Sequence, residues 1–512
     1  MKKILIIPMD DRPCTYDFPK QIAEIYGSEV LIPDKNFMGN LERIADRKEI
    51  SNFILKNSND ILGTIIASDT LAYGGLIPSR RTKSSFEKII KNFEVIKKLK
   101  ENNSNSPLHV CSTIQRISDS NENQEEKEYW KDYGKLIHNY SYLLHKNNIL
   151  TTKNYENIIV KKILTSNNEF DFLEEIKNKI PNQILEDYLN DRLRNLNVNK
   201  YLIDLVKHKY IDFLVISSDD SSSFGFNVIE REILKNYILA QKLENNVIMY
   251  PGADESVSVL TGRLINKIND FTPKFHCLYS ETELKENIIT MYEGIKIKET
   301  LKYQISSLGG VIKDKIDEAD IILYIHTSAD GQIDQYLNTI YKENIPKLSE
   351  EYINKDIENI SNLLKNNQKV VLIDCAYANG SNNDFMSKLG EKIDLSNLLA
   401  YSSWNTTGNS IGTAIAHASV KYISKKIDNY EHFKFLFERF CDDWLYQGFE
   451  RLNFIEKNNF PLNSEQLDEM KVILNKTINT FINKKFEMKY KFEIDELFFP
   501  WNRAFEIGIF LK

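Results

Sequence analysis

The feature that most constrains the fold is a repeated alternation of short apolar runs and helical segments. Ten runs rich in Val, Ile and Leu are each followed by a polar or glycine-containing turn and, in most cases, by a helical pattern. Continuous apolar runs are typical of strands buried on both faces, and intervening helices are typical of parallel sheets. The runs are Ile4–Pro8, Val30–Ile32, Ile65–Ala67, Leu108–Ile114, Phe213–Ile216, Val247–Tyr250, Phe275–Tyr279, Ile321–Ile325, Val370–Ile373 and Leu398–Tyr401.

We therefore expect an α/β fold of mostly parallel β/α units, either (β/α)-barrel-like or built as two facing α/β lobes. Residues 1–119 and 209–427 form the predicted α/β catalytic body. Residues 120–208 are predicted to be a helical insertion, and residues 428–512 a C-terminal extension of helices followed by strands. We find no internal sequence repeat. Connecting helices are predicted at Ser84–Lys100, Val228–Lys242, Ser256–Lys267, Ile353–Lys365 and Ile411–Lys425.

Charge and hydropathy argue against several classes of protein. The chain has 66 Lys and Arg residues and 73 Asp and Glu residues, which gives a net charge of −7. It therefore lacks the excess of positive charge that is typical of proteins that bind nucleic acid or an anionic membrane. No apolar stretch is long enough for a transmembrane helix, and the N-terminal run is too short for a signal peptide. Five scattered cysteines without a CxxC spacing favour a reducing compartment. We expect a soluble cytoplasmic protein, and the sequence leaves its oligomeric state open.

Charged and polar side chains follow most of the predicted strands. Because the carboxyl ends of parallel strands lie on one face, where α/β folds bind ligands, we expect these side chains to converge. Charged groups at so many strand ends favour a closed or nearly closed arrangement over a single open sheet. The candidates are Asp10, Asp11, Arg12, Asp69, Arg80, Arg116, Asp219, Asp220, Asp254, Glu255, His326, Asp374, Asn379, Trp404 and Asn405.

A single acid after a strand is often a helix N-cap, and we expect that structural role for Asp254 and Asp330. Paired acids differ, because at most one member of a pair can be the cap. Clustered like charges also cost energy unless they are compensated. The arginines expected to compensate them are Arg12, Arg80, Arg81 and Arg116.

Asp219 and Asp220 are the predicted catalytic pair. Adjacent acids after a strand point in different directions, so one can orient or polarise the substrate while the other donates a proton. Glycosidases divide such roles between two carboxylates. Trp404 and Asn405 would add an aromatic platform and an amide for a sugar ring. The alternative interpretation is a buried tryptophan beside a turn asparagine.

Other motifs are less specific. His326 has no second histidine nearby and the chain has no HExxH motif, which argues against zinc, whereas carboxylate-bound Mg²⁺ or Ca²⁺ is compatible with the sequence. Gly408–Gly412 matches GxSxG, but Ser410 follows a long loop instead of the strand turn that a serine-hydrolase elbow needs. Tight helix packing is the preferred interpretation of that segment. For Asp442 and Asp443 we expect a solvated helix face.

Taken together, several segments resemble a bacterial family known as domain of unknown function 4127. The resemblance covers nearly the whole chain and implies one family-wide unit, but it implies no activity. The similar segments are Pro8–Pro13, Asp69–Leu76, Asp219-Asp220 followed by Glu230–Glu232, Pro251–Glu255, Asp374–Gly380, Tyr401–Thr413, Asp442–Gln447 and Pro500–Arg503.

The preferred hypothesis is a hydrolase of a sugar or sugar-like substrate, a small molecule or glycan, that uses glycosidase-like acid/base chemistry. No cofactor is expected. The other acids would bind hydroxyls or support the pair, and the arginines would balance charge or hold an anionic group. One alternative is hydrolysis assisted by Mg²⁺ or Mn²⁺ through Asp, Glu and His side chains. A second is non-catalytic binding of a carbohydrate or metabolite.

Overall fold

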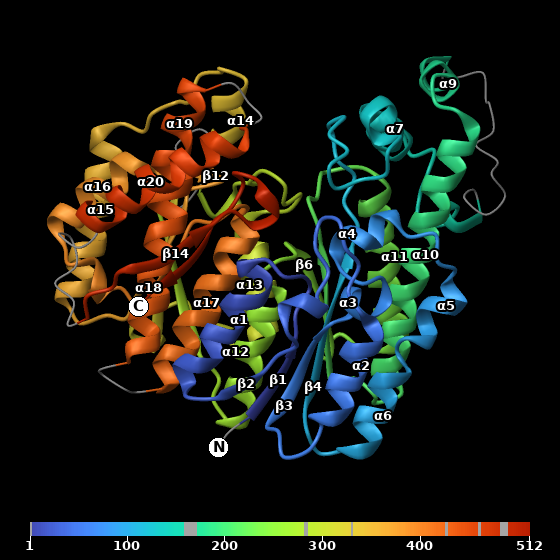
Figure 1. Cartoon of the computed structure of the whole chain (residues 1–512), viewed down its shortest axis with the longest axis horizontal. Helices are drawn as coiled ribbons and strands as arrows, with labels where there is room; N and C mark the ends of the chain where they lie inside the picture. Colours follow the sequence, from blue (N-terminus) through green and yellow to red (C-terminus); the bar gives the residue numbers. More distant parts are fainter. Residues whose placement is uncertain are drawn as a thin grey trace. The chain divides into compact units, whose positions relative to one another are not determined.

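The structure is a computed structural model that describes residues 3–157, 171–280, 285–328, 331–424, 429–458, 462–481 and 490–511. The chain divides into two compact units (Figure 1). We call Lys3–Asp11 with Leu31–Ala253 the N-terminal unit, and Arg12–Val30 with the described part of Asp254–Lys512 the C-terminal unit. Asp330, expected to be a helix cap, lies outside the described residues.

The N-terminal unit is built on a six-stranded sheet in the order β2-β1-β3-β4-β5-β6. The pairs from β1 to β6 are parallel, with Ile4 opposite Gly63 at one end and Ser218 opposite Pro251 at the other. All residues of β3, β4 and β5 are buried, as continuous apolar runs predict for a sheet covered on both faces. The strands are β1 (Lys3–Ile7), β2 (Glu29–Leu31), β3 (Gly63–Ala67), β4 (Leu108–Ile114), β5 (Phe213–Ser218) and β6 (Val247–Pro251).

The predicted insertion is helical where it is described, and its longest helix, α10, contacts β4 and β5 directly. Figure 1 shows α10 and α11 running alongside the sheet, and α7 and α9, which contact each other, lying beyond its upper end. The helices of this unit are η1 (Lys35–Phe37), α2 (Arg47–Lys56), α3 (Ser68–Ala72), α4 (Leu76–Arg81), α5 (Phe86–Lys91), α6 (Glu94–Asn102), α7 (Trp130–Lys146), α9 (Asp171–Asn178), α10 (Asn182–Lys207) and α11 (Phe226–Gln241).

The C-terminal unit has a five-stranded parallel sheet in the order β13-β11-β9-β7-β8. Its buried strands correspond to predicted runs, whereas two-residue strands such as β8 were not predicted. The strands are β7 (Lys274–Tyr279), β8 (Val311–Ile312), β9 (Ile321–Thr327), β11 (Val370–Cys375) and β13 (Ala400–Ser402), with the short pair β10 (Ile333–Asp334) and β12 (Tyr377–Ala378) at one end and the antiparallel pair β14 (Ile494–Phe498) and β15 (Gly508–Leu511) in the C-terminal extension.

The helices of the C-terminal unit form two groups. The helices α1, α12, α13 and α17 contact one another, and α17 also contacts β11 and β13. A large apolar core joins Tyr324 and Leu372 of the sheet to α15, α16 and the C-terminal segments. The helices are α1 (Pro13–Tyr26), α12 (Ser256–Ile268), η2 (Lys285–Asn287), α13 (Ile297–Leu308), η3 (Ile316–Glu318), α14 (Gln335–Ile340), α15 (Glu350–Lys365), α16 (Asn383–Lys392), η4 (Leu395–Asn397), α17 (Thr407–Ser424), α18 (Tyr430–Arg439), the π-helix η5 (Phe440–Glu450), α19 (Arg451–Lys457), α20 (Ser464–Phe481) and η7 (Pro500–Asn502).

The two units repeat one strand order. If the strands of each main sheet are numbered along the chain, the first five lie in the order 2-1-3-4-5. This is the flavodoxin-like arrangement of an open doubly wound sheet. No sheet formed by the described residues closes into a barrel, so the barrel-like alternative and the expected closed arrangement are wrong. Each sheet instead has a topological switch point, between β1 and β3 in one unit and between β7 and β9 in the other, where such folds bind ligands.

Two further expectations can be compared with the described residues. None of their helices is long and apolar enough to cross a membrane. The five cysteines, all of them described, form no disulfide bond.

A buried ion pair fixes the insertion helix α10 to the rest of the N-terminal unit. Arg192 pairs with Glu230 of α11 through two of its nitrogens, and both side chains are about 1% exposed. The same guanidinium donates to the carbonyls of Gln115 and Arg116, at 2.6 and 3.1 Å. Arg192 therefore holds the loop that follows β4 as well as α11.

Glu230→Ala should lower the free energy of unfolding by about 3–5 kcal/mol in urea titrations, because it leaves a buried guanidinium without its carboxylate. Glu175→Ala is the matched control. It removes an equally helical glutamate from an exposed pair with Lys179, which contributes at most about 1 kcal/mol. Equal losses in the two variants would contradict the structural role of the Arg192–Glu230 pair.

Candidate functional site

The carboxyl ends of β1 and β3, at the switch point of the N-terminal unit, are joined by α3. Thr70 in α3 donates its hydroxyl to the carbonyls of Pro8 and Met9, at 2.6 and 2.9 Å. The backbone carbonyl of Asp69 accepts the N–H groups of three following residues and so closes the turn. This local geometry fixes the side chain of Asp69 beside the end of β4.

Asp69 is a buried carboxyl group with an unusual environment. It is 1% exposed, and its Oδ2 accepts a hydrogen bond from Thr113 at 3.3 Å. Its Oδ1 is buried and has no hydrogen-bond partner among the described residues. Burial, together with the nearby Asp219 carboxylate, raises the pKa of Asp69 to about 7. A carboxyl group with this pKa can hold a proton near neutral pH.

Asp219, directly after β5, is held by Arg80 of α4. The guanidinium Nη2 of Arg80 contacts Asp219 Oδ2, while its Nη1 lies 3.0 Å from Glu125 and 3.5 Å from Glu126. The Arg80 side chain is 4% exposed, so these charge-assisted contacts are screened little by solvent. The predicted compensation of this acid by Arg80 is therefore present.

Asp220 is held separately, by Arg116 from the loop after β4. Nη1 of Arg116 donates to Asp220 Oδ2 at 3.0 Å. The other two nitrogens contact Glu126 and Glu125, at 3.0 and 3.1 Å. We call these two arginines and four acids the carboxylate–guanidinium cluster; its members are Arg80, Arg116, Glu125, Glu126, Asp219 and Asp220.

The two adjacent aspartates have unequal environments. Asp219 is 12% exposed and paired with a buried arginine, whereas Asp220 keeps 32% of its side-chain surface exposed. Burial and the Asp219 charge raise the pKa of Asp220 to about 6, although Arg116 and Arg80 oppose the rise. Asp220 also has a positive φ of 35°, which aspartate adopts more readily than most residues. The arrangement separates one ion-paired carboxylate from one that can exchange a proton.

Asp10 and Asp11, after β1, belong to the same unit but are not in the cluster. Asp10 is buried at 2% exposure. Asp11 turns toward a different loop, where its carboxylate lies 3.4 Å from the Asn40 amide and 3.9 Å from Arg43. The predicted role of Asp11 in binding hydroxyls or supporting the catalytic pair stays a prediction.

Arg12, Asp254 and Glu255 lie in the C-terminal unit. Arg12 donates two hydrogen bonds to Asp254, at 2.7 and 3.3 Å, so Asp254 has an ionic role that its expected capping role did not include. Glu255 accepts a hydrogen bond from Gln304 at 3.2 Å and is 1% exposed. Arg12, which was predicted to compensate an acid, therefore pairs with Asp254 within the C-terminal unit.

His326 and Asp374 are neighbours in register on β9 and β11 and are both buried. Nδ1 of His326 lies 2.6 Å from Asp356, and its ring stacks on Phe385 with centroids 3.9 Å apart. The Asp374 carboxylate accepts the backbone N–H groups of Ala376 and Asn382, at 3.1 and 2.8 Å. Asp374 therefore shapes the loop after β11.

Trp404, Asn379 and Asn405 are also structural. Trp404 is 3% exposed, so the interpretation as a buried tryptophan is correct and the open aromatic platform is wrong. Asn379 donates to Asp334 at 2.7 Å, and its N–H donates to the Asn405 carbonyl at 2.8 Å. Ser410 lies inside α17 with its hydroxyl donating to the Trp404 carbonyl, which excludes a serine-hydrolase elbow.

The expectation of a solvated face at Asp442 and Asp443 is wrong, because both are nearly fully buried in the π-helix η5. Arg439 contacts both carboxylates, at 3.3 and 2.7 Å. Asp443 also accepts hydrogen bonds from the Ser403 N–H and the Ser402 hydroxyl, at 2.7 and 3.0 Å, directly at the end of β13.

Sequence reasoning missed Glu125 and Glu126. The available signal was a pair of adjacent acids shortly after the strand-end arginine Arg116, but these residues fell within the segment assigned to the insertion. It also missed Trp501, which the guanidinium groups of Arg12 and Arg503 flank at 4.8 and 4.6 Å from its ring centroid. Trp501 has a positive φ of 55°, an uncommon conformation for an aromatic residue.

The described residues contain no group of three or more His, Cys, Asp or Glu side chains arranged to hold a metal ion. The acids of the cluster instead alternate with guanidinium groups, each of which occupies carboxylate oxygens. Asp69 and Asp220 are the members of this region whose pKa values favour proton transfer near neutral or mildly acidic pH.

Asp69→Asn should make stability less dependent on pH. The pKa of Asp69 is raised in the folded state, so its contribution to stability is complete below the unfolded pKa of 3.8 and is lost as the pH rises through about 7. The variant should match the native chain near pH 4 and exceed its free energy of unfolding by up to about 4 kcal/mol at pH 8. Urea unfolding at both pH values tests this, and the same difference at both would contradict the raised pKa.

Comparison with known proteins identifies a family but no function. No curated protein and no solved structure matches this chain. The family model described as "Protein of unknown function (DUF4127)" matches residues 4–510, nearly the whole chain and both units. The chain therefore belongs to the DUF4127 family.

Proposed function

We propose that this protein is a hydrolase of a sugar or sugar-like substrate, with Asp219 and Asp220 as its working carboxylates. The observation that carries the proposal is the inequality of these two adjacent acids. One is fixed by a buried arginine, and the other is partly exposed with a pKa raised to about 6. Glycoside hydrolysis needs this division between a charged carboxylate and a protonated one.

In the proposed reaction Asp220 is the general acid, because it is the more exposed of the two and keeps a proton at mildly acidic pH. It would donate that proton to the leaving oxygen as the glycosidic bond breaks. Asp219, ion-paired with Arg80, would stabilise positive charge at the reacting carbon or orient the attacking water. Asp69, whose buried Oδ1 has no hydrogen-bond partner among the described residues, would accept a hydrogen bond from a substrate hydroxyl group.

The setting of the proposed reaction follows from the same residues and the composition. We propose a small-molecule or glycan substrate, no nucleic-acid or membrane partner, no cofactor, and a cytoplasmic location. The net charge of −7 supports the proposal that nucleic acid and anionic membranes are not partners, and the five described cysteines, which form no disulfide bond, fit a reducing compartment.

Asp220→Asn should lower kcat on a panel of chromogenic glycosides by about 10²- to 10⁴-fold, which is the usual contribution of general acid catalysis. The fold should be unchanged, since asparagine also tolerates positive φ. Asp60→Asn is the matched control: Asp60 has a φ of 55°, is exposed and lies in the same unit. Unchanged turnover in Asp220→Asn would contradict the assignment of Asp220 as the general acid.

Two outcomes of the same assay favour the alternatives. Loss of turnover with a chelator, restored by Mg²⁺ or Mn²⁺, would indicate metal-assisted hydrolysis by the acids of the cluster. Tight binding of a sugar with no turnover in the native chain would indicate a binding protein.

Arg116→Gln should move the alkaline limb of the pH–rate profile. A general acid works below its pKa, so kcat/KM should fall as the pH rises above about 6. Arg116 lowers the pKa of Asp220, and its removal should shift this limb to higher pH. Arg81→Gln is the control, because the hydrogen bonds of Arg81 go to backbone carbonyls. An unmoved limb in Arg116→Gln would exclude Asp220 as the titrating acid.

A further inference from the structure

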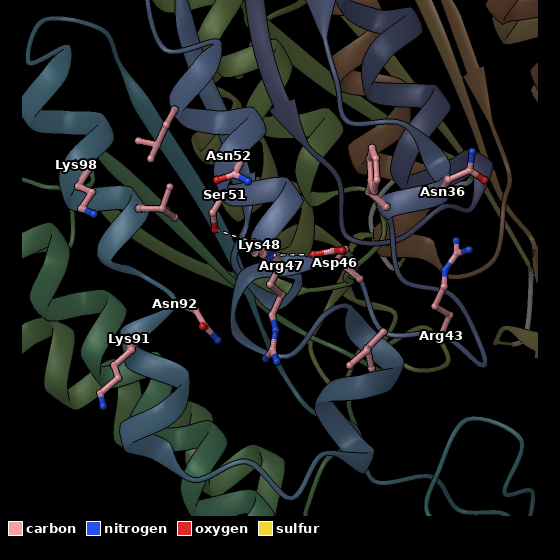
Figure 2. A pocket seen from close by; sticks show the side chains of 15 residues that line it. Asn36, Arg43, Asp46, Arg47, Lys48, Ser51, Asn52, Lys91, Asn92 and Lys98 are labelled. Carbon is pink, nitrogen blue, oxygen red and sulfur yellow. Dashed lines mark hydrogen bonds between the residues drawn. The ribbon is translucent and has the colours of Figure 1, made fainter.

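A groove of about 1010 Å³ lies in the N-terminal unit, and none of the proposed catalytic residues lines it. Its walls come from η1 and the loop after it, from α2, and from the segment containing α5 and α6. Figure 2 shows Lys91 and Lys98 on one side, Arg47 near the centre, and Asn36 and Arg43 on the other side. The volume is at the upper end of the range for small-molecule sites.

The lining of the groove is strongly basic in an otherwise acidic chain. Its five cationic residues are Arg43, Arg47, Lys48, Lys91 and Lys98, and Asp46 is its one acidic residue. The Asp46 carboxylate accepts the backbone N–H groups of Lys48 and Glu49, at 3.1 Å each, as the cap of α2. The chain as a whole carries a charge of −7, so this is a local concentration of positive charge.

Arg47 is the best-positioned cation in the groove. Its Nη1 donates to the Ala72 carbonyl at 3.1 Å, and the Asn92 amide donates to the same oxygen at 3.4 Å. A guanidinium carries five N–H donors in a planar fork, so Arg47 can bind an anion while it keeps this bond. Ser51 and Asn52 add a hydroxyl and an amide along the same wall.

Four of the five cations stand on two separate elements, Arg47 and Lys48 on α2 and Lys91 and Lys98 on the segment of α5 and α6, and Arg43 lies on the loop after η1. This division suits a ligand with more than one anionic oxygen. Beside Asn36 and Arg43, the side chains of Phe37 and Ile44 are 42% and 56% exposed and add apolar surface to that side of the groove.

We propose that this groove binds a small molecule that carries a phosphoryl group. Arginine forks and lysine ammonium groups together are the usual protein ligands of phosphate. The volume suits one small molecule, whereas a stable protein interface buries about 800 Å² on each partner, more than one such groove offers. The proposal does not depend on the function proposed for Asp219 and Asp220.

Titration calorimetry on the full chain tests the proposal with inorganic pyrophosphate, glucose 6-phosphate and uncharged glucose. Both phosphorylated probes should bind, with affinity falling as salt rises because exposed charges are screened, and glucose should not. Lys48→Gln combined with Lys98→Gln should weaken binding by about tenfold, the expected effect of losing two exposed ion pairs.

Lys56→Gln is the matched control, because Lys56 is also exposed on α2 but does not line the groove. Thermal unfolding of each variant shows whether it remains folded. Phosphate binding that survives in the double variant, or no binding by either phosphorylated probe, would overturn the proposal. Binding of a polyglutamate peptide but of neither phosphorylated probe would overturn the ligand class and indicate an acidic protein partner.

Discussion

The N-terminal unit depends on guanidinium groups that are buried beside the carboxyl ends of its strands. Arg80 and Arg116 share Glu125 and Glu126, and each then holds one of two adjacent aspartates. Without these cations, taking four acids out of water would cost several kcal/mol for each charge. The arginines thus make an acid-rich strand end compatible with folding. Each arginine holds one aspartate, but the Arg80–Asp219 pair is more buried than the Arg116–Asp220 pair, so the two carboxylates have different environments.

The two units share one strand order, but among the described residues only the N-terminal unit offers a candidate catalytic centre. Both sheets end in polar loops at a switch point. In the C-terminal unit those loops are occupied by internal contacts: Asp443 holds the end of β13, and Asp374 holds the loop after β11. Both acids accept backbone N–H groups, which is the role of structural carboxylates. In the N-terminal unit Asp220 keeps 32% of its surface exposed, and Asp69 keeps an oxygen without a partner among the described residues. Groups that are not committed to holding the backbone are the ones that can act on a substrate.

The sequence predicted the positions of the strands well, but it predicted poorly which side chains contact each other. Each of the ten apolar runs overlaps a strand, because burial on both faces demands a continuous apolar pattern that is visible locally. The pair Asp219-Asp220 and its arginines were also visible, since charged groups that follow strands stand out. The burial of Trp404 and Asp443 was not. It depends on contacts with Phe505 and Ser402, about 100 and 40 residues away, and no local pattern reports such distances. The expectation of a closed sheet was wrong for a related reason. Two separate open sheets have as many strand ends that can carry charged residues as one barrel has, so the sequence does not distinguish them.

The helix α3 connects the acidic and basic parts of the N-terminal unit. It begins with Ser68 and Asp69 beside the end of β4 and ends at Ala72, whose carbonyl accepts hydrogen bonds from Arg47 and Asn92 of the basic groove. Only two residues, Thr70 and Leu71, therefore lie between a carboxyl group with a raised pKa and a carbonyl that contacts the basic groove. Residues of this helix are also bonded to the strand ends, Asp69 to Thr113 of β4 and Thr70 to the carbonyls of Pro8 and Met9, so α3 is a fixed link between the two parts.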